Sequence, residues 1–149
     1  MRLYLRQRVL SVFGQRNYEV HDEKGSLCYV VEQQLSFPKE FRVYDSKNKC
    51  VGSVKKKFFC FPGTFVLTEN GKTDEVKKTW FGKNYRFLIK TWLAQENRII
   101  RDFRITDKNG TPIATIDNGN RGCAIEISSK EHAMMVLLFA VAVLRHKYR

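Results

Sequence analysis

The feature that most constrains the fold is an apolar run close to the end of the chain. Residues 133–144 read AMMVLLFAVAVL, with no charged residue, glycine or proline among them. A helix that is apolar on every side must be enclosed by protein or by lipid. A helix that crosses a bilayer needs about 20 apolar residues, which is more than this run contains. The run therefore predicts a core helix over residues 129–146, surrounded by the rest of the chain.

Both ends of this predicted helix carry local signals. Ser128 and Glu131 have the spacing of a capping box, in which each side chain accepts a backbone N–H bond at the start of a helix. Arg145, His146 and Lys147 put positive charge at the other end, where it complements the helix dipole. These signals favour a helix that begins just after Ser128.

A short hairpin pattern occurs three times, in residues 18–25, 41–48 and 103–110. Each copy has an aromatic residue, then Val or Ile two positions later, then Asp two positions after that, and finally Gly or Asn. An Asp side chain accepts backbone N–H bonds in a tight turn, and Gly or Asn tolerates the positive φ required there. The pattern therefore predicts three β-hairpins with turns capped by Asp22, Asp45 and Asp107.

Alternating apolar and polar residues predict further strands between these hairpins. The pair Asn70-Gly71 is the strongest two-residue turn signal in the sequence. Tyr85, Phe87 and Ile89 are expected to share one face of a strand, residues 55–61 to extend the strand before them, and residues 98–106 to form a long strand. In total, about twelve strands are expected between residues 2 and 127.

The number of strands and the apolar helix point to the same architecture. Many short antiparallel strands leave exposed edges unless the sheet closes on itself. A closed barrel of about twelve strands is too wide for its own side chains to fill, and a continuous apolar helix would fill it. We therefore predict one domain over residues 1–149 of the mainly β (α+β) class, a closed antiparallel barrel wrapped around one buried C-terminal helix.

Three parts of the sequence resemble the LURP-one-related family. They are the N-terminal strand LYLRQRV, the repeated hairpins, and the ending EISSKEHAMMVLLFAVAVLRH. The resemblance covers nearly the whole chain, and the family belongs with the tubby C-terminal domain and the phospholipid scramblases. It implies a twelve-stranded barrel around a central helix, and phosphoinositide binding in some tubby-type relatives.

Residue patterns for catalysis and for metal binding are missing from the sequence. It contains no GxSxG, HExxH, Walker or GxGxxG motif, and its four Cys and three His residues have no zinc-binding spacing. His21 and Asp22 are neighbours on a strand and point to opposite faces, so they cannot act as a pair. The three turn Asp residues lie in separate turns rather than around one calcium ion. We expect a non-enzymatic protein with no catalytic residues, cofactor or metal.

The cysteines and the start of the chain suggest a compartment. Cys28, Cys50, Cys60 and Cys123 each lie in an apolar strand pattern, so buried, unreactive thiols are expected, with Cys60 the one expected to be most exposed. Met1 is followed by charged and aromatic residues rather than by an apolar signal segment. We therefore expect a cytoplasmic protein with reduced thiols, peripheral at a membrane if it binds lipid.

The basic residues carry the functional hypothesis. The formal net charge is +12, which is larger than the net charge of about 2–8 that is sufficient to keep a small domain soluble. Two lysine clusters precede aromatic residues and form the candidate site: Lys55, Lys56, Lys57, Lys77 and Lys78. Cations beside aromatic rings suit anionic phospholipid head groups. They also suit single-stranded nucleic acid, whose bases stack on rings, while on ordinary strands lysine simply points outward and phenylalanine inward.

These basic and aromatic residues therefore fit two kinds of partner. We predict a binding module for anionic phospholipid head groups or phosphoinositide-like ligands, with a nucleic-acid-binding regulator as the alternative. A barrel that holds a small apolar ligand is disfavoured, because the predicted helix would occupy the cavity.

Overall fold

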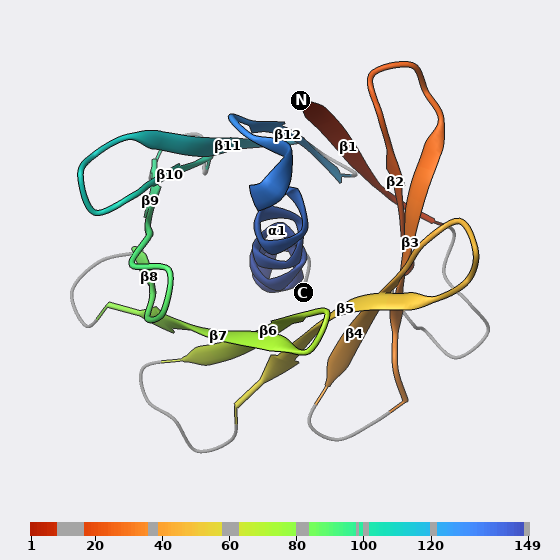
Figure 1. The fold of residues 1–149 in the computed structure, drawn as a ribbon, viewed down its shortest axis with the longest axis horizontal. Coiled ribbons are helices and arrows are strands. Elements are labelled where there is room, and N and C mark those ends of the chain that lie inside the picture. The colour runs from red at the N-terminus through yellow and green to blue at the C-terminus, as the bar shows by residue number, and fades with distance from the viewer. Residues whose placement is uncertain are drawn as a thin grey trace.

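The fold is a closed, twelve-stranded antiparallel barrel (Figure 1). The computed structural model describes residues 1–8, 17–35, 39–57, 63–79, 84–97, 99, 102–119 and 122–147, the last three as backbone alone. The strands are β1 (Arg2–Gln7), β2 (Asn17–His21), β3 (Leu27–Gln33), β4 (Glu40–Tyr44), β5 (Cys50–Lys56), β6 (Thr64–Glu69), β7 (Lys72–Lys78), β8 (Tyr85–Phe87), β9 (Leu93–Glu96), β10 (Phe103–Thr106), β11 (Pro112–Asn118) and β12 (Gly122–Ile127).

Each strand pairs with its neighbours in sequence, and the first strand closes the barrel on the last. The register of β1 against β12 pairs Leu3 with Ile125, and that of β1 against β2 pairs Leu5 with Val20. These residues are buried and alternate with exposed ones such as Tyr4, because successive side chains of a strand point to opposite faces. Closure satisfies the strand edges that an open sheet would expose.

The apolar run forms the centre of the barrel, as predicted. A 3-10 turn (Lys130–His132) leads into α1 (Ala133–Lys147), which runs through the interior of the barrel (Figure 1). Every residue from 133 to 144 is at most 9% exposed. The ring of Phe139 lies 5.5 Å from Tyr85, 5.4 Å from Phe87 and 5.4 Å from Phe103, measured between ring centroids. The helix thus packs against strands that are distant from it in sequence.

The start of the helix differs from the prediction. The N-cap of the 3-10 turn is Ser129, whose side chain makes no capping hydrogen bond, and the α-helix proper begins four residues later. The predicted capping box of Ser128 and Glu131 is therefore wrong. A 3-10 turn closes with i to i+3 bonds, here from the N–H of His132 to the carbonyl of Ser129 at 3.0 Å, and so needs no side-chain cap.

The three repeated turns have the predicted capping geometry. In each, one carboxylate oxygen of the Asp accepts backbone N–H bonds from the residues two and four positions later, at 2.8–2.9 Å. The φ angles of the last turn residues are 82° at Gly25, 61° at Asn48 and 81° at Gly110. Asn48 therefore adopts the left-handed conformation that glycine adopts in the other two turns, and the repeat is confirmed.

The strand around residue 89 was predicted wrongly. β8 ends at Phe87, and Ile89 lies in the turn that follows instead of sharing a strand face with Tyr85 and Phe87. The carboxylate of Asp74, itself only 2% exposed, accepts the N–H of Ile89 at 2.9 Å and that of Lys90 at 3.0 Å. These bonds turn the chain before the alternation can continue.

Other predictions about strands and cysteines have mixed outcomes. The strand expected over residues 55–61 ends at Lys56 in β5, and residues 58–61 lie outside the described part. The strand expected over residues 98–106 begins at Phe103 in β10, and residues 98, 100 and 101 lie outside the described part. Burial is confirmed for Cys123, while Cys28 is half-buried and Cys50 is exposed. Cys60 lies outside the described residues.

Candidate functional site

The five candidate lysines divide between the two faces of their strands. Lys55, Lys57 and Lys77 are exposed on the outer side of the barrel wall. Lys56 and Lys78 follow buried Val54 and Val76 at a spacing of two, so they lie on the inward side at the ends of β5 and β7, where they are half-buried. Consecutive lysines cannot share a strand face, and the predicted cluster is therefore not one surface.

A row of cations crosses the outer wall where β5, β6, β7 and β8 lie side by side. The N–H of Lys57 donates to the carbonyl of Thr64 at 2.9 Å. Thr64 is the register partner of Lys77, and Lys77 is the partner of Arg86. We call Lys57, Lys77 and Arg86 the basic row. The candidate residues chosen from the sequence did not include Arg86, because its position beside Lys77 depends on the register of β7 and β8.

The charges of this row are only partly balanced. The Nζ atom of Lys57 lies 3.1 Å from Oε1 of Glu75. In the next row, Lys55 faces Glu40, which pairs with Arg42 at 3.4 Å. Among the described residues, neither Lys77 nor Arg86 forms an ion pair. Like charges directly opposite each other on neighbouring strands are destabilising, so an anion bound here would relieve a repulsion built into the fold.

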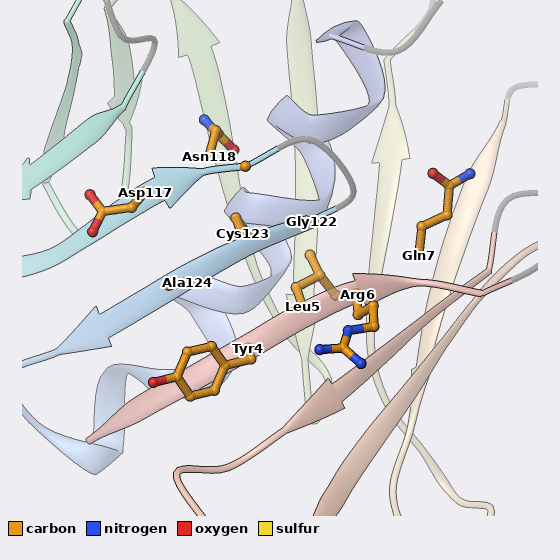
Figure 2. A pocket seen from close by; sticks show the side chains of 10 residues that line it. Tyr4, Leu5, Arg6, Gln7, Asp117, Asn118, Gly122, Cys123 and Ala124 are labelled. Atoms are coloured by element: carbon orange, nitrogen blue, oxygen red, sulfur yellow. The ribbon is translucent and has the colours of Figure 1, made fainter. Parts of the chain in front are cut away.

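A groove of about 690 Å³ on the other side of the barrel is a second candidate (Figure 2). Its floor is β12, whose outward residues Gly122 and Ala124 are small, and its walls come from β1 and β11. A methyl group added at Gly122 would overlap the carbonyl oxygen of Leu5. The close approach of β1 to β12 therefore requires the glycine, and the groove follows from this packing.

The groove carries charges of both signs. Tyr4 and Arg6 stand on β1, and Asp117 stands on β11 across the floor (Figure 2). Burial raises the pKa of the Asp117 carboxyl above its ordinary value, and the neighbouring carboxyl of Asp102 raises it further. With Arg6 on one wall and a carboxylate on the other, the groove does not select for anions. It is also far from the basic row, so we do not take it as the site.

Two features are absent from the described residues. No three His, Cys, Asp or Glu side chains come together there as candidate metal ligands. In the same part of the chain, no helix is both long and apolar enough to cross a bilayer.

A closed antiparallel barrel around a central C-terminal helix places the chain in the class of tubby-like barrels. The model of the LURP-one-related family matches residues 1–144, and the chain belongs to that family. An X-ray structure of an Arabidopsis thaliana protein has the same fold, with a TM-score of 0.65 and 13% sequence identity over 99% of this chain and 92% of that one. No curated protein matches the chain significantly. The resemblance stated from the sequence is thus confirmed.

Proposed function

We propose that this protein is a non-enzymatic binding module whose basic row engages the head groups of an anionic phospholipid surface. The observation that carries the proposal is the pairing of Lys77 directly opposite Arg86, with no acidic partner for either among the described residues. A phosphate group between the two side chains would convert their repulsion into two favourable interactions.

The geometry of the wall supports a surface as the partner rather than a small molecule. The basic row lies on the outside of a closed barrel, and the interior is filled by α1. Each exposed lysine or arginine near an anionic bilayer contributes about 1 kcal/mol to binding. The row therefore provides weak, salt-dependent attraction, because exposed charges are screened over about 8–10 Å at physiological ionic strength.

Nucleic acid is the competing partner, and the described aromatic residues disfavour it. Single-stranded nucleic acid binds by stacking bases on exposed rings. Beside the basic row, Tyr85 and Phe87 are 7% and 1% exposed, and Trp92 is 4% exposed. These rings belong to the core and offer no stacking surface. The aromatic residues that follow the lysines in sequence, 58, 59, 61, 80 and 81, lie outside the described residues.

The test is co-sedimentation with vesicles of phosphatidylcholine, with and without phosphatidylserine, at low and moderate salt. The test variant is Lys77→Ser/Arg86→Ser. Its control is Arg6→Ser/Lys24→Ser, which removes an exposed arginine of β1 and an exposed lysine of the turn between β2 and β3, away from β5 to β8 (Figure 1). We expect the test variant to bind anionic vesicles roughly thirtyfold more weakly than wild type, from about 2 kcal/mol of lost attraction. The control should lose much less.

Three outcomes would contradict the proposal in different ways. Failure of the wild type to bind anionic vesicles at low salt would exclude the lipid partner. Equal losses in the two variants would show that net charge, and not the basic row, determines binding. Tighter binding to single-stranded DNA than to vesicles at matched salt would move the nucleic-acid function into first place.

A further inference from the structure

The turn between β8 and β9, residues 88–92, presents two aliphatic side chains to solvent beside the basic row. Leu88 is 50% exposed and Ile89 is 70% exposed. Leu88 is two residues from Arg86, a separation of about 7 Å along an extended chain. Single exposed apolar residues are common on protein surfaces, but an adjacent pair is a feature that a partner could use.

The backbone of this turn is held in place from beneath. The two carboxylate oxygens of Asp74 accept the N–H groups of Ile89 and Lys90 at 2.9 and 3.0 Å, and the N–H of Leu88 donates to the carbonyl of Glu75 at 2.9 Å. Thr91 has a φ of 58°, which is uncommon for a β-branched residue. The protein thus fixes Leu88 and Ile89 in an exposed position instead of folding them inward.

Positive charge lies next to this aliphatic pair. The Nζ atom of Lys90 lies 5.1 Å from the ring centroid of Trp92. The ring of Trp92 is 4% exposed and packs 5.2 Å from Phe87 and 5.0 Å from His132, measured between centroids. The turn therefore combines exposed aliphatic side chains with a cation whose ammonium group lies over the ring of Trp92.

A pocket of about 600 Å³ separates the turn from the third repeated hairpin turn. It is lined by Arg86 and Lys108, and by the apolar side chains of Leu88 and Trp92. Among its described lining residues, Asp107 carries a carboxylate, which already accepts N–H bonds from Asn109 and Thr111 at 2.8 and 2.9 Å. Arg86 lies both in the pocket and in the basic row, so the two surfaces are continuous.

We propose that the 88–92 turn is a membrane anchor, in which Leu88 and Ile89 insert below the head groups while Arg86 and Lys108 hold a lipid phosphate in the adjacent pocket. The inference rests on the proposed function, because the basic row brings the barrel to the anionic surface. An aliphatic tip bordered by cations matches a bilayer interface, where an apolar layer begins directly beneath the phosphates.

The anchor is tested by vesicle co-sedimentation at moderate salt with Leu88→Ser/Ile89→Ser. The control is Leu27→Ser/Leu35→Ser, since Leu27 and Leu35 are 50% and 76% exposed and lie in and just after β3, across the barrel from β8 (Figure 1). We expect the anchor variant to bind anionic vesicles at least about tenfold more weakly, because each inserted aliphatic side chain loses its transfer from water. The control should stay within about twofold of wild type.

A fluorescent label at the tip provides a second readout. With Cys28, Cys50 and Cys60 replaced by Ser, an environment-sensitive dye on Ile89→Cys should shift to the blue on binding and be quenched by lipids that carry a spin label near the head group. A dye that stays in water while the protein is bound would overturn the anchor, as would equal binding of the anchor variant and its control. Either result would leave the basic row intact, whereas a wild type that does not bind would overturn both proposals.

Discussion

At the residue scale, two glycines separate the effect of backbone conformation from the effect of space. A methyl group at Gly110 or at Gly63 would meet no atom within 4 Å, but only Gly110 has a positive φ, 81°. Left-handed backbone costs a residue with a Cβ atom about 1–2 kcal/mol. We predict that Gly110→Ala lowers the free energy of unfolding by about 1 kcal/mol, while Gly63→Ala leaves it unchanged or slightly raised.

Denaturant unfolding monitored by circular dichroism measures both variants. A loss of stability at Gly63 as large as that at Gly110 would mean that the turn conformation is not what the glycine provides.

The three turns could be predicted from sequence because their chemistry is local: one Asp side chain and one residue with positive φ complete each turn. Lys56 and Lys78 show what local sequence does not predict. Each is adjacent to another lysine, and only the strand geometry determines that it lies on the inward face.

At the element scale, α1 is the element on which the barrel depends. Leu138 is 0% exposed in the middle of the helix, and an unpaired charge in an apolar core is severely destabilising. We predict that Leu138→Asp abolishes folding, while Lys130→Asp, at an exposed position in the 3-10 turn before the helix, keeps a melting temperature close to wild type. Soluble yield and calorimetry check both. A Leu138→Asp variant that melts like wild type would contradict a central helix.

The elements themselves were predictable to different degrees. The apolar run predicted a buried helix because a helix with no polar face must be enclosed on every side. The alternation of Tyr85, Phe87 and Ile89 predicted a strand that ends earlier in the structure. The strand ends early because the carboxylate of Asp74, on a different strand, binds the backbone of the following turn. The sequence pattern of residues 85–89 alone therefore cannot predict where the strand ends.

At the scale of the whole molecule, the closure of the barrel could be predicted from the number of strands. The arrangement of the candidate binding site could not. The basic row and the 88–92 turn are set by the register of β5 to β8 and by the partner of Asp74. The lysine clusters of the sequence lie on β5 and β7 and just after β5, and Lys57, Lys77 and Arg86 are the residues of this wall that we propose for binding. The groove over β12 also depends on long-range pairing, of β1 with the last strand.

The most direct test of the account is a lysine-reactivity footprint of the wild-type protein, with and without vesicles that contain phosphatidylserine, read by mass spectrometry. Acylation should fall at Lys57, Lys77 and Lys108 when vesicles are present, because these side chains face the lipid. Lys24 is exposed in the turn between β2 and β3, away from β5 to β8 (Figure 1), and should react equally in both samples. Protection of Lys24 with unchanged reactivity at Lys57 and Lys77 would contradict the basic row as the binding surface.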